Sequence, residues 1–236
     1  MKGILAIETA TDACSVALWR DGAVTECHEV IPRQHSQRLF SMLAELLPGG
    51  NLRDAGVEAI AYGAGPGSFT GLRVAASAVQ GLCFAAALPA IPVSTLACQV
   101  QSALREGLVE EGQLVASLID ARINEIYGAV YRIEGGLPQE VVPAQACAPQ
   151  YFQPDASAGP VTVIGSGARF LEAFSPDFRQ RIAQVEESVL PHSGDLLPLA
   201  LAIAATGGLQ NAMQVQPVYV RDEISWKKIS EQGKRK

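Results

Sequence analysis

Hydrophobic and polar positions along the first half of the chain predict an alternation of short strands and amphipathic helices. Asp21-Gly22 separates two strand-like runs, and this dipeptide is typical of a type I′ hairpin turn because both central residues need a positive φ. Pro48-Gly49-Gly50 ends the first helical segment. The expected strands are residues 3–8, 14–20, 23–30 and 57–62, and the expected helices are residues 34–47 and 70–88.

The second half shows a similar pattern. Two strand-like runs are followed by a turn at Glu134-Gly135-Gly136 and a third run, as in the first half. The expected strands are residues 114–120, 125–133, 137–146 and 161–165, with helical segments at 168–174 and 194–205. Residues 215–220 predict a final strand that returns the chain to one of the sheets.

Because the pattern repeats, we predict a duplicated α/β fold with a mixed sheet in each lobe and a cleft between the lobes. No repeat is visible residue by residue. The expected divisions are an N-terminal lobe over 1–106, a C-terminal lobe over 107–224 and a basic tail over 225–236.

Composition narrows the functional class. A net charge of −6 argues against a nucleic-acid binder that acts through overall charge. The basic tail is either a solvated terminus or a contact for RNA or an acidic partner. The five cysteines are widely spaced without a CxxC, as expected of reduced thiols. Acids appear too early for a signal peptide, and residues 74–88 are too short and too polar to span a membrane. We therefore expect a cytoplasmic protein with no membrane contact.

The most distinctive segment is GAGPGSFTGLR, residues 63–73. Its spacing fits neither the Walker A motif nor the dinucleotide fingerprint, and Ser68 lacks the flanking glycines of a nucleophile elbow. Ser68 or Thr70 is expected to cap a helix that begins near Gly71. A tight structural turn is favoured over a cradle for a ligand.

Two acids stand at equivalent points of the halves, Glu8 and Asp120, each at the end of a first strand. Facing acids across a cleft can hold a metal bound to phosphates, so they are the candidate nucleotide-binding residues. Neither is followed by the glycines of a phosphate-binding hairpin, which favours structural acids instead. The histidines His28, His35 and His192 are scattered, so no metal site is predicted.

Two predicted helices are candidates for interaction surfaces. Residues 34–47 carry more than one apolar face, and residues 70–88 are rich in alanine and glycine, which lets another backbone come close. Packing inside the lobe and contact with a partner subunit both stay open at this point.

The segments ILAIETATDACSVAL, GAGPGSFTGLRVA, LIDARINEIYGAVY and PVYVRDE together resemble the TsaB (YeaZ) family. Members are accessory subunits in adding threonylcarbamoyl to the adenosine beside the tRNA anticodon. The resemblance spans nearly the whole chain. It implies the actin-like, sugar-kinase and Hsp70-type ATPase fold, with ribonuclease H-like lobes.

The resemblance also implies a relation to the catalytic subunit TsaD, which carries V-H-H-x-x-x-H after the corresponding helix. Here Thr95 and Gln99 stand where its metal histidines would be, and hydroxyl and amide groups cannot replace imidazoles. We therefore expect a non-catalytic scaffold that supports TsaD and binds no metal. The alternatives are an ATPase or kinase that uses Glu8 and Asp120 around Mg²⁺–ATP, and a zinc-dependent glycoprotease.

The implied partners are TsaD, in a heterodimer through N-terminal-lobe helices, the ATPase subunit TsaE, and tRNA through the complex. A homodimer would use the same surface when the chain is alone. No cofactor is firmly indicated, and ATP or ADP at the boundary with TsaD stays open. The expected interface residues are Leu39, Leu43, Leu47, Gly71, Arg73, Ser77 and Gln80.

Overall fold

The computed structural model describes residues 1–154 and 159–220, and their first half builds a five-stranded mixed sheet. Its strands are β1 (Gly3–Glu8), β2 (Ala13–Arg20), β3 (Ala23–Val30), β4 (Ala59–Gly65) and β5 (Ala90–Ser94), in the order β3-β2-β1-β4-β5. The first three pair antiparallel, and β4 and β5 run parallel to β1. The basic tail at 225–236 lies outside the described residues.

The second sheet repeats this arrangement. Its strands are β6 (Leu114–Arg122), β7 (Glu125–Glu134), β8 (Leu137–Cys147), β9 (Val161–Ile164) and β10 (Ile182–Glu186), in the order β10-β9-β6-β7-β8. Three antiparallel strands again lead into two parallel ones. The duplicated α/β architecture with a mixed sheet in each half, predicted from the sequence, is therefore confirmed.

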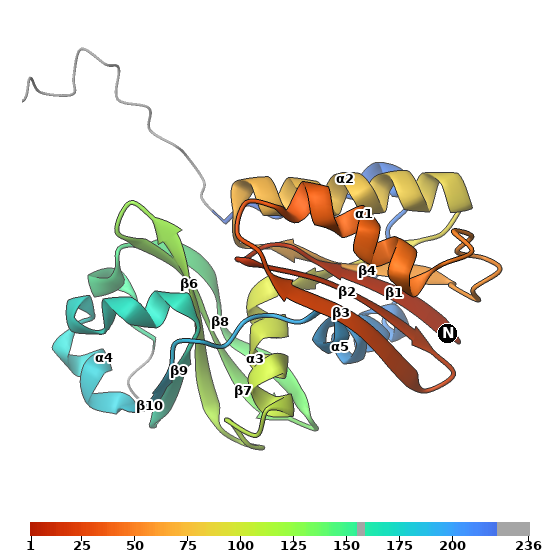
Figure 1. The fold of residues 1–236 in the computed structure, drawn as a ribbon. Helices are drawn as coiled ribbons and strands as arrows, with labels where there is room; N and C mark the ends of the chain where they lie inside the picture. The colour runs from red at the N-terminus through yellow and green to blue at the C-terminus, as the bar shows by residue number, and fades with distance from the viewer. Residues whose placement is uncertain (155–158, 221–236) are drawn as a thin grey trace, which may run out of the picture.

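Helices cover both faces of the first sheet (Figure 1). On one face lie α1 (His35–Leu46) and α2 (Phe69–Ala86), and on the other lie α3 (Thr95–Arg105) and α5 (Ser193–Ala205). The strands are apolar on both sides as a result: Leu5 and Ile7 of β1 pack with α1 and α2, whereas Ile4 and Ala6 belong to the core with α3 and α5. The shorter segments are η1 (Pro149–Tyr151), η3 (Ser166–Ala173), α4 (Pro176–Arg181) and η4 (Ala212–Gln214).

The helix α5 corrects the sequence-based division into lobes. Its residues were assigned to the C-terminal lobe, yet it packs on all five strands of the first sheet and against α3. The helix α3 in turn contacts four strands of the second sheet, as well as β4 and β5 of the first. The helix α3 therefore lies between the two sheets, and α5 packs against α3 from the side of the first sheet. The reason is that α5 is apolar nearly all round and needs cover from both sides.

Several other boundaries differ from the predicted ones. Residues 215–220 form no strand: Val218 donates a backbone hydrogen bond to the Ala64 carbonyl (2.7 Å), but Pro217 has no N–H to extend a ladder. Residues 63–65, expected in a loop, complete β4. The segment at 168–174 belongs to a 3₁₀ helix rather than an α-helix. Among the described residues, the strands β5 and β10, the helices α3 and α4 and the short 3₁₀ segments η1 and η4 have no counterpart in the prediction.

The helix α2 also changes the expectation about membranes. It spans Phe69–Ala86, whereas the membrane expectation was based on residues 74–88. Its 18 residues, with a mean hydropathy of 1.3, are long and apolar enough to cross a bilayer by length and composition alone. Its apolar content has a structural use, because residues such as Leu72, Ala75 and Val79 are buried against the first sheet. The contacts therefore assign α2 to the core of the lobe.

Candidate functional site

The glycine-rich segment is a junction between β4 and α2 that packs on the turn after β1. Ser68 caps α2: its Oγ accepts from the Gly71 N–H (3.3 Å), and its own N–H donates to the Ala10 carbonyl (2.7 Å). A Cβ at Gly67 or Gly71 would overlap the backbone carbonyl of Ala10 or Thr9. These glycines therefore serve a close approach within the chain, which favours the structural turn over a ligand cradle.

Glu8 is completely buried at the end of β1 and is hydrogen-bonded locally. Its Oε1 accepts from the Ala10 N–H (2.6 Å), and its Oε2 accepts from the Thr95 hydroxyl (3.3 Å). The carboxylate lies directly on Gly63, where a Cβ would overlap it. Burial raises the pKa of Glu8 to about 7, despite these hydrogen bonds.

Asp120 lies near the end of β6, which continues to Arg122, and its carboxylate is also hydrogen-bonded locally. Oδ1 accepts from the Arg122 N–H (2.8 Å), and Oδ2 pairs with Arg169 at 3.1 Å. Among residues 1–154 and 159–220, no hydrogen bond or ion pair joins Glu8 to Asp120. Each acid is instead hydrogen-bonded to the backbone two residues further along the chain.

Thr95 and Gln99, which the sequence resemblance places at the positions of metal histidines, lie in a buried, hydrogen-bonded network. Thr95 donates to Glu8, Gln99 Oε1 accepts from the Ser117 hydroxyl (2.7 Å), and Gln99 Nε2 donates to the Val189 carbonyl (2.8 Å). All polar atoms of the Gln99 amide head thus have protein partners. This set does not fit a tight metal ion, because it offers neither imidazole nor thiolate, and only one carboxylate, Glu8.

Three of the expected interface residues are core residues. Leu39, Leu43 and Leu47 are 0%, 7% and 8% exposed and belong to the hydrophobic cluster between α1, α2 and the first sheet. Gly71 is buried as well, under the turn after β1. The leucine stripe of α1 faces its own sheet, so these four residues are not available to a partner.

The remaining three, Arg73, Ser77 and Gln80, lie on the exposed side of α2. Exposed aromatic side chains accompany them, namely Phe69 and Phe84 on α2 and Phe40 on α1. We call these six residues the α1–α2 surface. Within it the Arg73 guanidinium lies 3.6 Å from the centre of the Phe69 ring, and its Nε donates to the Tyr219 hydroxyl (3.1 Å).

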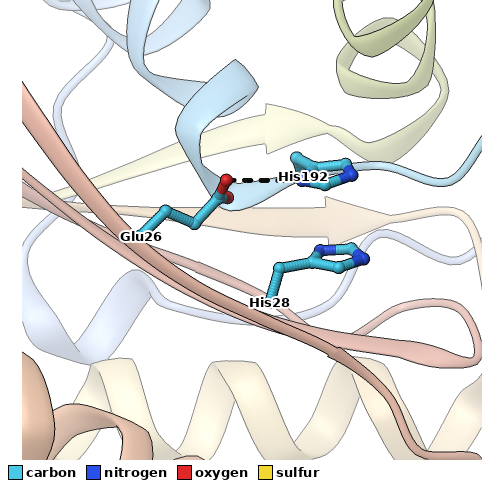
Figure 2. A group of neighbouring side chains, drawn as sticks. All are labelled: Glu26, His28 and His192. Carbon is cyan, nitrogen blue, oxygen red and sulfur yellow. Dashed lines mark hydrogen bonds and ion pairs between the residues drawn. The ribbon is translucent and has the colours of Figure 1, made fainter.

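The structure brings together two histidines that appear scattered in the sequence. His28 on β3 and His192 before α5 stack with ring centroids 3.6 Å apart and an interplanar angle of 7° (Figure 2). Glu26, two residues before His28, lies beside them with Oε2 3.3 Å from His192 Nδ1. The spacing of Glu26 and His28, which places both side chains on one face of a strand, was the available signal. Nothing in the sequence connects His192 to them.

Comparisons with known proteins agree on one group. The family model described as "TsaD: tRNA N6-adenosine threonylcarbamoyltransferase" matches residues 27–191. The "tRNA threonylcarbamoyladenosine biosynthesis protein TsaB" of Escherichia coli (strain K12) is 38% identical over 232 residues, which cover 96% of this chain and 97% of that protein. The protein of the same description from Haemophilus influenzae is 35% identical over 234 residues, with 96% of each covered. The solved structure "YeaZ from Pseudomonas aeruginosa" matches with a TM-score of 0.84 and 39% identity, over 93% of this chain and 100% of that one.

Proposed function

This chain belongs to the TsaB (YeaZ) family of tRNA threonylcarbamoyladenosine biosynthesis proteins, and on that premise we propose that it is a non-catalytic scaffold which binds and supports the transferase TsaD and helps present tRNA to it. The family model with which it aligns is that of the transferase itself. That alignment supports the view that the chain is a relative of the catalytic subunit.

The observation that carries the proposal is the buried, hydrogen-bonded network around Gln99. In a metal-dependent transferase of this fold we would expect imidazole ligands at the positions of Thr95 and Gln99. Here the amide of Gln99 is fixed between Ser117 and Val189, and Thr95 is fixed to Glu8. A group that is already hydrogen-bonded and buried gains nothing by binding an ion, so this region supports structure rather than turnover.

Glu8 gives further support. With its pKa near 7 the carboxyl is only partly ionised at neutral pH, and its oxygens are committed to Ala10 and Thr95. A ligand for Mg²⁺–ATP should be an ionised carboxylate with a free oxygen. We therefore favour the scaffold over an ATPase or kinase centred on Glu8 and Asp120.

We propose the α1–α2 surface as the docking site for TsaD. Phe40, Phe69 and Phe84 are 59%, 55% and 75% exposed on one side of the first lobe, and aromatic residues with arginine are enriched in protein interfaces. We retain the interface role that the sequence analysis predicts for Arg73, Ser77 and Gln80. A homodimer of the isolated chain would use the same surface.

The remaining parts of the proposal concern the wider assembly. TsaE and tRNA would join through the complex with TsaD, in the cytoplasm. Any ATP or ADP is expected at the boundary with TsaD rather than at Glu8.

The catalytic part of the proposal is tested by transfer of threonylcarbamoyl to tRNA in vitro. We expect no product from the purified chain alone and product when TsaD and TsaE are added. Product formed by this chain alone would overturn the non-catalytic assignment.

The interface is tested separately by co-purification with TsaD. Phe84→Asp or Phe40→Asp should weaken the complex by about 2 kcal/mol, about thirtyfold in Kd, because each buries a charge in an apolar contact. The matched control is Val141→Asp on β8, where an exposed apolar residue of the other sheet becomes the same acid. Normal co-purification of both phenylalanine variants would show that TsaD binds elsewhere.

A further inference from the structure

The Glu26–His28–His192 cluster joins the free edge of the first sheet to the start of α5. Glu26 and His28 project from β3, the edge strand, and His192 is the residue immediately before α5. One carboxylate oxygen, Oε1, accepts from the Ser15 hydroxyl (2.8 Å), the Ser193 hydroxyl (2.9 Å) and the Gly194 N–H (2.8 Å). These three donors fix the carboxylate and leave Oε2 directed at His192, as Figure 2 shows.

The separations within the cluster are those of metal ligands. One ligand atom from each of the three residues lies within 4.8 Å of the other two. The 3.3 Å between Glu26 Oε2 and His192 Nδ1 matches the distance between two ligands of one tetrahedral ion, which is about 3.4 Å for bonds of about 2.1 Å. His28 completes the set, because its Nδ1 is buried and has no hydrogen-bond partner among residues 1–154 and 159–220.

From this geometry we propose that Glu26, His28 and His192 bind a divalent transition-metal ion of the zinc class. Two imidazoles and one carboxylate suit Zn²⁺, Co²⁺ or Ni²⁺, whereas Mg²⁺ and Ca²⁺ prefer oxygen ligands alone. The site is independent of the Thr95–Gln99 network and of the proposed scaffold function. Since the nitrogen lone pairs lie in the ring planes, the stacked rings must tilt out of their parallel arrangement when the ion binds.

The cluster is also accessible from solvent. The side chains of His192 and Glu26 are 21% and 25% exposed, which gives an ion access from solvent.

The test is titration of the full chain, freed of metal by a chelator, with Zn²⁺ in a calorimeter and with Mg²⁺ for contrast. We expect one Zn²⁺ per chain and no response to Mg²⁺. His28→Gln and His192→Gln should each weaken Zn²⁺ binding at least about tenfold, since each removes a ligand. The matched control is His35→Gln on α1. This third histidine is hydrogen-bonded to the Ala13 carbonyl of β2, away from the cluster, and its replacement should leave Zn²⁺ binding unchanged.

A second measurement needs no variant. In spectra of histidine ring nitrogens of the unaltered chain, Zn²⁺ should shift the signals of His28 and His192 and leave those of His35 in place. The proposal is overturned if the unaltered chain takes up no Zn²⁺, if the ring signals of His28 and His192 do not move, or if the folded double variant at these positions binds as tightly as the original.

Discussion

Replacing Glu8 by glutamine should stabilise the protein at alkaline pH and leave its stability unchanged under acid conditions. The change keeps the shape of the side chain and an oxygen that accepts from the Ala10 N–H. It removes the one ionisable group that is completely buried at the end of β1. The effect on the free energy of unfolding should therefore depend on pH in a defined way.

The magnitude follows from the two pKa values of the carboxyl. Burial raises its pKa from 4.5 to about 7 in the folded chain, so between these pH values the folded state holds a proton that the unfolded state has released. Stability consequently falls as pH rises through this window, by about 1.4 kcal/mol for each pH unit. The loss amounts to about 3 kcal/mol above pH 7 and is absent below pH 4.5. Glutamine does not titrate, so Glu8→Gln escapes the loss.

The assay is urea denaturation of the original and variant chains at a series of pH values from 4.5 to 8.5. We expect the difference between them to grow with pH in favour of the variant. Glu58→Gln, which changes an exposed acid just before β4, is the control and should show no such growth. Parallel stability curves for Glu8→Gln and the original chain would refute the assignment of a buried carboxyl that is protonated in the folded state.

Three further substitutions test the packing. Leu43→Asp should lower the free energy of unfolding of the chain by about 4 kcal/mol or more, because the residue is in the core. Ala44→Asp, on the exposed side of α1, should leave the melting temperature nearly unchanged. Equal melting temperatures of the two variants would contradict this prediction. Gly63→Ala should cost about 1–3 kcal/mol in denaturant titration because the added methyl overlaps the Glu8 carboxylate, and an unchanged midpoint would show that the site has room. Phe152→Ala should cost about 3–5 kcal/mol, since its ring is fully buried between Phe174 and Phe178, and a loss below about 1 kcal/mol would mean that this cluster closes around the gap.

The topology was predictable because its signals are local. Asp21-Gly22 fixes the register of β2 and β3 through the turn, and the same strand–turn–strand pattern marks β7 and β8. The strand β5 was missed because it has five residues, contains Pro92 and passes directly into α3 with no turn residue between them. Proline in a short run hides a strand, and a capping serine that is also the last strand residue hides a helix start.

The candidate sites were less predictable, because they depend on which face of each helix is covered by the rest of the chain. The apolar positions of α1 could face either a sheet or a partner, and only the packing shows that Leu39 and Leu43 face the sheet while Phe40 faces solvent. The local environment of Glu8 was partly predictable, since its position at a strand end implied a hydrogen-bonded acid. The meeting of His28 with His192 was not, because it depends on where α5 returns to the first sheet.

The packing of α5 on the first sheet constrains the order in which the chain can fold during synthesis. All five strands of the first sheet have been synthesised by residue 94. One of the two helices that cover the face with Ile4 and Ala6 is residues 193–205, near the end of the described chain. Until those residues emerge, apolar side chains such as Ile4, Ala6 and Ile91 have no complete cover. We therefore expect that the N-terminal half does not fold on its own and that its expression alone gives an aggregation-prone product. The first sheet can be fully covered only after α5 has been synthesised. Folding of the first sheet therefore depends on contacts between residues that are distant in sequence.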